Sequence, residues 1–141
     1  MRIGLGQFDA VVGDLEGNAK RMREIYGQAR KQGVELLLFP ELAVCGYPPE
    51  DLLLKRHFLD DNRRVVEKLA ADCPDATIVA GFADYYRGNA YNSAGILRDG
   101  QLANVYRKGL LPNEGVFDEQ QHDVRIHLLV QELVCHSSWP F

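Results

Sequence analysis

The first third of the chain combines a short alternating pattern, an amphipathic stretch and a continuous apolar run. Residues 2–8 alternate apolar with small side chains, which predicts a strand. Asp14 is a candidate N-cap for a helix over residues 15–32, where apolar positions recur every three or four residues until Gly33 ends the pattern. Residues 34–39 are almost entirely apolar, which predicts a strand buried on both faces. This strand–helix–strand order is typical of a parallel α/β sheet.

The pattern continues with a second amphipathic helix and three more strands. We expect the helix at about 52–71 and a buried strand at 76–82. Strands at 91–98 and 101–106 then form a hairpin around Asp99-Gly100. The predicted fold class is therefore α/β: a mostly parallel sheet with residues 34–39 near its centre and both helices on one face. The apolar face of the second helix is expected to contain Leu54, Phe58, Val65, Val66, Leu69 and Ala70.

Composition narrows the functional classes. A length of 141 residues suits one domain with a real core, and a net charge of −4 argues against nucleic-acid binding. No apolar run approaches the length of a membrane span, and residues 1–8 lack the features of a signal peptide. Three widely spaced cysteines do not suggest a disulfide framework. We therefore expect a cytoplasmic protein without nucleic-acid or membrane partners.

The chemistry of the chain is expected where the apolar run of residues 34–39 ends. Pro40 lacks an N–H group and should end the strand, so Glu41 stands at the carboxyl end of a buried strand, where ligands of α/β folds gather. The segment Gly46-Tyr47-Pro48-Pro49 then imposes a stiff turn. Such an elbow would hold the Glu41 carboxylate against apolar surroundings, as suits a general base. The alternative is a solvated loop glutamate.

These residues also carry a family resemblance. Phe-Pro-Glu at 39–41 followed by Gly-Tyr-Pro-Pro-Glu-Asp-Leu-Leu at 46–53 resembles the nitrilase (carbon–nitrogen hydrolase) superfamily. The longer segment narrows this to the N-terminal glutaminase domain of glutamine-dependent NAD⁺ synthetases. The resemblance implies an αββα-sandwich nitrilase-like fold, of which this chain would hold the N-terminal portion only. It also implies a Glu–Lys–Cys triad, in which Glu41 matches the general base.

The segment Tyr91-Asn92-Ser93-Ala94 also resembles the family, and a further matching segment begins with Tyr106-Arg107-Lys108. By resemblance, the hairpin before it delivers the catalytic lysine, Lys108, whose ammonium would stabilise the oxyanion of amide hydrolysis. An exposed surface lysine is the alternative. The family pattern also assigns Phe117 and Glu119 to the substrate pocket. Glu114 stands where the family has a tyrosine that contacts glutamine. If Glu114 faces the pocket as a substrate-binding residue, its carboxylate would repel the α-carboxylate of glutamine and weaken binding.

The resemblance stops at about residue 119. We therefore expect residues 1–119 to be the N-terminal part of a nitrilase-like amidase domain and residues 120–141 to be an unmatched tail. Within that tail, Cys135 keeps the family's spacing to Trp139 but lacks the Glu-Asp pair that normally follows the nucleophile. Cys135 is thus the remaining candidate for the catalytic cysteine. The tail is explained either by a frameshift or truncation or by a genuine short variant.

The resemblance implies glutamine amide hydrolysis that supplies ammonia for ATP-dependent NAD⁺ synthesis, as part of a longer enzyme. ATP and Mg are implied for the missing synthetase domain, and no cofactor or metal is expected in this chain. The chain alone is expected to be inactive. An uncovered sheet face should favour self-association, hence a homo-oligomer. The alternatives are another carbon–nitrogen hydrolase acting on a small amide, or a non-catalytic fragment that only associates with other subunits.

Overall fold

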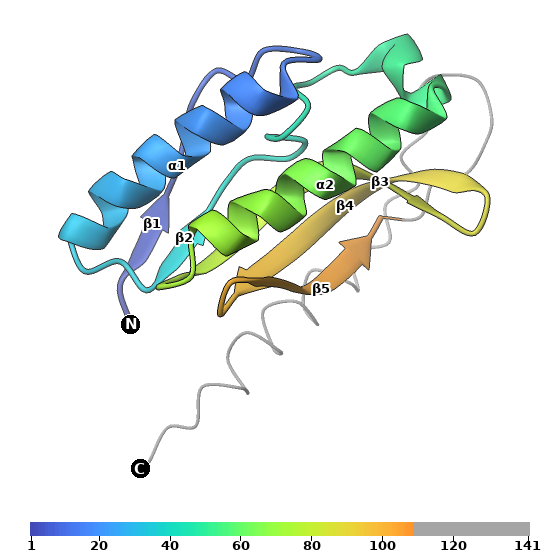
Figure 1. The fold of residues 1–141 in the computed structure, drawn as a ribbon. Coiled ribbons are helices and arrows are strands. Elements are labelled where there is room, and N and C mark those ends of the chain that lie inside the picture. The colour runs from blue at the N-terminus through green and yellow to red at the C-terminus, as the bar shows by residue number, and fades with distance from the viewer. Residues whose placement is uncertain (109–141) are drawn as a thin grey trace.

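The computed structural model describes residues 1–108. This part of the chain has one layer of two α-helices and one layer of five strands (Figure 1). In chain order the elements are β1 (Ile3–Leu5), α1 (Leu15–Lys31), β2 (Leu36–Leu38), the 3₁₀ helix η1 (Glu50–Leu54), α2 (Arg56–Asp72), β3 (Thr77–Tyr86), β4 (Asn89–Arg98) and β5 (Gln101–Arg107).

The sheet is mixed, with the strand order β1-β2-β3-β4-β5. Strands β1, β2 and β3 are parallel, whereas β4 and β5 are antiparallel to their neighbours. Strand β2, which lies within the run of residues 34–39, is next to the central strand β3, as predicted. The prediction of a mostly parallel sheet is wrong, because two of the four strand pairings within residues 1–108 are antiparallel. The cause is a second hairpin: Arg87 and Gly88 adopt positive φ angles of 48° and 91° and turn β3 directly into β4.

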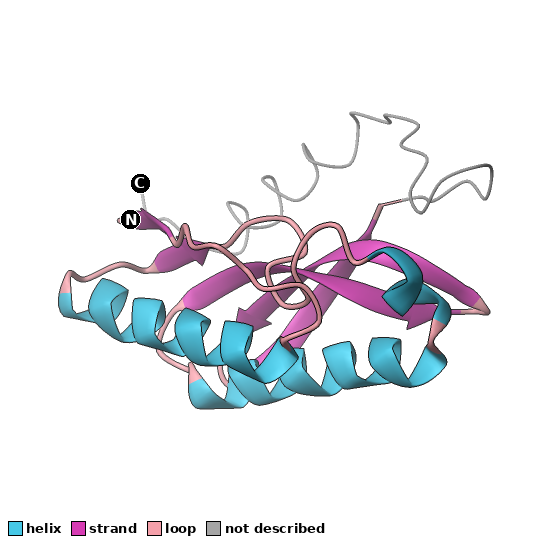
Figure 2. Cartoon of the chain, turned by 90° about the horizontal axis from the view of Figure 1, so that it is seen from above, coloured by secondary structure: helices cyan, strands magenta, loops and turns pink. Residues whose placement is uncertain are grey.

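Both helices cover the same face of the sheet, as predicted (Figure 2). The side chain of Asp14 accepts a hydrogen bond from the Gly17 N–H at 3.0 Å, which confirms it as the N-cap of α1. Gly33 follows the last turn of α1 with φ of 71°, a conformation that glycine adopts without steric cost. Local sequence signals therefore fix both ends of the helix that packs over β1 and β2.

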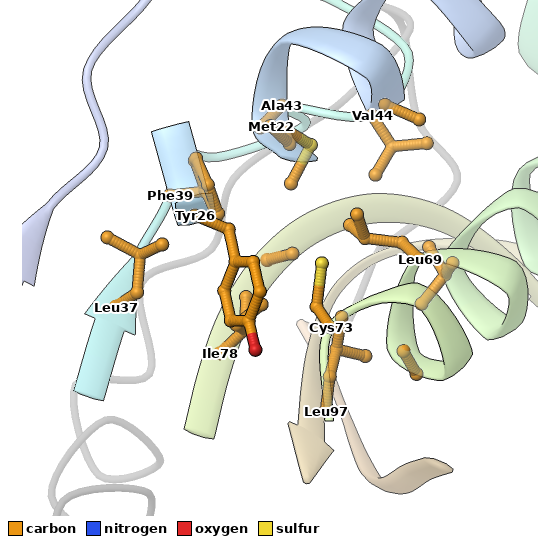
Figure 3. Packing of buried hydrophobic residues seen from close by; sticks show 14 of the residues in the cluster. Met22, Tyr26, Leu37, Phe39, Ala43, Val44, Leu69, Cys73, Ile78 and Leu97 are labelled. Carbon is orange, nitrogen blue, oxygen red and sulfur yellow. The ribbon is translucent and has the colours of Figure 1, made fainter. Parts of the chain in front are cut away.

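The main core lies between the helices and the sheet (Figure 3). Met22 of α1, Leu69 of α2 and Ile78 of β3 are fully buried there. Leu54 was expected on this apolar face, but its side chain is 84% exposed. The reason is that Lys55 has an extended backbone, which separates η1 from α2 and points the end of η1 away from the core.

The opposite sheet face carries apolar side chains as well. Leu5 of the edge strand β1 is 71% exposed, and Ile3 is exposed beside it. On β2, Leu36 and Leu37 are both buried although they point to opposite faces, as expected for this strand. The predicted self-association of this face stays a prediction. Among residues 1–108, no helix combines the length and apolar character needed to span a bilayer.

Candidate active site

An elbow of residues 40–46 follows β2 and is packed tightly against the central strand. The Val44 N–H donates to the Gly81 carbonyl at 3.1 Å, so the elbow continues alongside β3 after β2 ends. A Cβ atom on Gly81 would lie 2.3 Å from the Leu42 nitrogen and 2.7 Å from the Glu41 Cα. Only glycine at this position allows the elbow backbone to approach β3 so closely. The position of Glu41 is therefore set by a backbone-to-backbone contact.

Asn18 of α1 braces the elbow from the other side. Its side-chain amide donates to the Val44 carbonyl at 3.0 Å and to the Val11 carbonyl at 2.8 Å, while its oxygen accepts from the Val11 N–H at 2.9 Å. Asn18 is buried, so these three bonds satisfy a polar group inside the protein. The first helix is thus tied both to the loop before it and to the elbow.

Glu41 itself points away from the buried part of the elbow. Its four successors, Leu42 to Cys45, are almost completely buried, whereas the Glu41 side chain is 52% exposed. The expectation of a carboxylate desolvated by an apolar surround is therefore wrong for this structure. Its position just after the end of β2 is confirmed.

Lys108 lies next to Glu41 in space although 67 residues separate them in sequence. Its Nζ atom is 3.7 Å from Glu41 Oε1. The main chain of Lys108 is fixed as well, because its N–H donates to the Asn92 carbonyl at 2.8 Å. The prediction that the hairpin would deliver Lys108 to the neighbourhood of Glu41 is confirmed, and the catalytic role of each residue stays a prediction.

Asn92 of β4 is the site residue that the sequence interpretation missed. Its Nδ2 group donates to Glu41 Oε1, the same oxygen that Lys108 approaches. Asn92 therefore contacts Glu41 with its side chain and Lys108 with its main chain. The residue is buried. The signal in the sequence was the segment Tyr91-Asn92-Ser93-Ala94, which resembles the family but suggested no role for the asparagine.

The remaining candidates divide into two groups. Cys45 and Cys73 are buried in the core, as expected for small apolar residues. Glu114, Phe117, Glu119 and Cys135 lie outside the described residues. Within residues 1–108, no group of three or more metal-ligating side chains comes together. The described part of the site thus consists of the Glu41 carboxylate, with the Lys108 ammonium and the Asn92 amide both at its Oε1 atom.

The two buried thiols lead to a prediction. Burial raises the pKa of the Cys45 thiol to about 12 and that of Cys73 to about 11, from an ordinary value of 9.0. Since the thiolate is the reactive form, we expect neither residue to react with iodoacetamide at pH 8 until the chain is unfolded. Unfolding returns both thiols to their ordinary pKa, so between pH 9 and about 12 the folded state holds more protons than the unfolded state. The stability that the two protonated thiols contribute is therefore fully present below pH 9 and is lost as the pH rises from 9 through about 12.

Mass-spectrometric mapping of the labelled peptides, with and without urea, tests this expectation. The same samples report the reactivity of Cys135 separately. Rapid native labelling of Cys45 would contradict the burial of the elbow described above.

The fold and the site together define a class of protein. A strand-end carboxylate facing an ammonium on an α/β layer is an arrangement suited to proton transfer and oxyanion stabilisation in hydrolysis. The carbon–nitrogen hydrolase family matches residues 2–127. The chain belongs to this family and has its nitrilase-like fold.

Individual relatives agree with this assignment. The glutamine-dependent NAD(+) synthetase of Thermotoga maritima is 44% identical over 124 residues, which cover 86% of this chain and 21% of the relative. The structure of the glutamine-dependent NAD(+) synthetase from Cytophaga hutchinsonii is 30% identical with a TM-score of 0.75, covering 89% of this chain and 21% of that one. An amidase from Nesterenkonia sp. is 25% identical with a TM-score of 0.64, over 85% and 49% of the two chains. The chain thus spans about a fifth of the length of the synthetases that it matches.

Proposed function

We propose that this chain contributes the general base and the oxyanion-stabilising lysine of a glutamine amidase that supplies ammonia for NAD⁺ synthesis. The single observation that carries the proposal is the convergence of Glu41 and Lys108 at 3.7 Å from distant positions in the sequence. The relatives named glutamine-dependent NAD(+) synthetase support the choice of glutamine as the amide.

In the proposed mechanism, Glu41 accepts the proton of a cysteine thiol, and the thiolate attacks the carboxamide carbon. The carbonyl oxygen then carries negative charge, which the Lys108 ammonium stabilises; one such donor commonly contributes about 2.7–4 kcal/mol. Ammonia leaves with a proton returned by Glu41, which gives a thioester. Water, deprotonated by Glu41, attacks the thioester carbon through a second oxyanion that Lys108 again stabilises. The carbon–sulfur bond then breaks, the acid product leaves, and Glu41 returns its proton to the cysteine sulfur.

The other parts of the proposal follow from the family. Glutamine would be the substrate, the ammonia would pass to a synthetase domain that uses ATP and Mg, and the protein would act in the cytoplasm as a homo-oligomer. Cys135 would be the nucleophile, Phe117 and Glu119 would shape the pocket, and Glu114 would weaken the binding of glutamine. Repulsion between the carboxylate of Glu114 and the α-carboxylate of glutamine is the physical reason.

Ammonia release from glutamine by the purified chain tests this proposal. We expect little release, because Cys135 lacks the following Glu-Asp pair and Glu114 replaces the tyrosine. Whatever release is measured should disappear in both Cys135→Ala and Glu41→Gln, since both act in the covalent pathway. Release that survives both substitutions would contradict the proposed roles.

A further inference from the structure

A buried ion pair lies on the helix-covered face of the sheet, behind the Glu41–Lys108 pair. Asp84 of β3 has a side chain that is only 3% exposed. Its Oδ2 atom accepts a hydrogen bond from Arg107 Nε at 2.6 Å, and its Oδ1 atom lies 3.5 Å from Arg63 Nη1 of α2. The Arg107 guanidinium also lies 4.1 Å from the centre of the Tyr86 ring. A carboxylate and an aromatic ring therefore both hold Arg107.

Arg107 is the last residue of β5, and Lys108 follows it directly. Side chains of successive strand residues point to opposite faces, so Arg107 points toward Asp84 and α2 while Lys108 points toward Glu41. The register agrees, because Arg107 is paired with Ser93, the neighbour of the asparagine that donates to Glu41. The two contacts thus lie on the two faces of one strand end.

Burial makes the contact on the helix face strong. A carboxylate that is removed from water keeps its charge at low cost only when it is paired and hydrogen-bonded. Asp84 has both oxygen atoms engaged, and the Arg107 contact is the shorter of the two. The Lys108 side chain is long and 41% exposed, so many of its rotamers are accessible. Holding its ammonium beside Glu41 therefore requires that the backbone of Lys108 be fixed.

We propose that the Asp84–Arg107 pair positions Lys108. By holding the last residue of β5 against the buried carboxylate, the pair fixes the backbone from which Lys108 extends, and it keeps the ammonium beside Glu41. Asp84 and Arg107 act here as positioning residues and do not touch the substrate. The functional meaning rests on the role proposed above for Lys108, but the geometry can be tested without turnover.

A zero-length carbodiimide cross-link measures this geometry in the full chain. The reagent joins a carboxylate and an amine only when the two groups touch, so the yield of the Glu41–Lys108 cross-link reports their contact. Glu16 and Lys68, whose charged atoms lie 3.5 Å apart on α1 and α2, provide an internal reference. Mass spectrometry measures the ratio of the Glu41–Lys108 cross-linked peptide to the Glu16–Lys68 one. This ratio corrects for differences between samples in reagent activity and in the fraction of folded chain.

We expect Asp84→Asn and Arg107→Gln each to lower this ratio by about threefold or more, the size of a typical coupling between contacting residues. Arg107→Lys keeps the charge but loses the Nε donor, so it should restore part of the ratio. Arg98→Gln is the matched control: it removes the same charge at the end of β4, where Arg98 pairs with the exposed Asp99, and should leave the ratio unchanged.

An unchanged ratio in Asp84→Asn and Arg107→Gln, with native circular dichroism, would overturn the proposal. If neither variant folds, Tyr86→Leu decides, because it removes the ring over Arg107 without leaving a buried charge unpaired. A lower ratio in that variant supports the proposal and an unchanged one overturns it. Failure of the amidase function would appear in ammonia release and would leave these cross-link ratios unaffected.

Discussion

Gly81→Ala is expected to destabilise the folded chain by about 3 kcal/mol, the upper end of the usual range for overpacking of a core. The added methyl group would lie 2.3 Å from the Leu42 nitrogen and 2.6 Å from the Pro40 carbonyl oxygen. Both are backbone atoms, which cannot turn aside as a side chain can. Accommodating the methyl group therefore requires the elbow to move away from β3, which would also stretch the hydrogen bond from Val44 to Gly81.

Urea unfolding of the two proteins measures this effect. Gly27→Ala is the control, because Gly27 lies within α1 and nothing is within 4 Å of the position of its added methyl group. That change should stabilise the chain by about 0.5–1 kcal/mol through helix propensity. Because the elbow carries Glu41, Gly81→Ala should also reduce the Glu41–Lys108 cross-link. Unfolding curves of wild type and Gly81→Ala that superimpose would contradict the close packing of elbow and strand.

The elements with strong local signals could be predicted from the sequence. The N-cap Asp14 and the terminating Gly33 mark α1, and Asp99-Gly100 marks the hairpin between β4 and β5. The hairpin at Arg87-Gly88 was missed because arginine rarely takes the positive φ that it has there. Missing it made the sheet look mostly parallel, since the central strand was expected to end too early.

The candidate site could be predicted only in part. Glu41 and Lys108 stand out because each follows a strand and each belongs to a segment that resembles a family. Asn92 also lies in a segment that resembles the family, but an asparagine inside a strand acquires its role only when the register of β4 places it beside Glu41. The exposure of the Glu41 side chain could not be predicted either, because apolar neighbours in the sequence do not determine which side chain of a tight turn faces solvent.

Glu41→Gln is expected to lower the rate of glutamine hydrolysis severely. The substitution keeps the size of the side chain and a carbonyl oxygen for Asn92, but it removes the carboxylate that we propose as the acceptor of the thiol proton. Loss of a general base commonly costs about 10²–10⁴-fold in rate. Lys108→Met should have a comparable effect, about 10²–10³-fold, through loss of oxyanion stabilisation.

The most direct measurement uses a chimera in which residues 1–108 of this chain replace the matching segment of the Thermotoga maritima relative, which is 44% identical to this chain over 124 residues. Glutamine-dependent NAD⁺ synthesis by the chimera is compared with synthesis from added ammonia, which bypasses the amidase site. We predict that the chimera uses glutamine, and that Glu41→Gln lowers this activity about 10²–10⁴-fold while ammonia-dependent synthesis is unchanged. A Glu41→Gln chimera that still uses glutamine at the rate of its parent would contradict the assignment of the base.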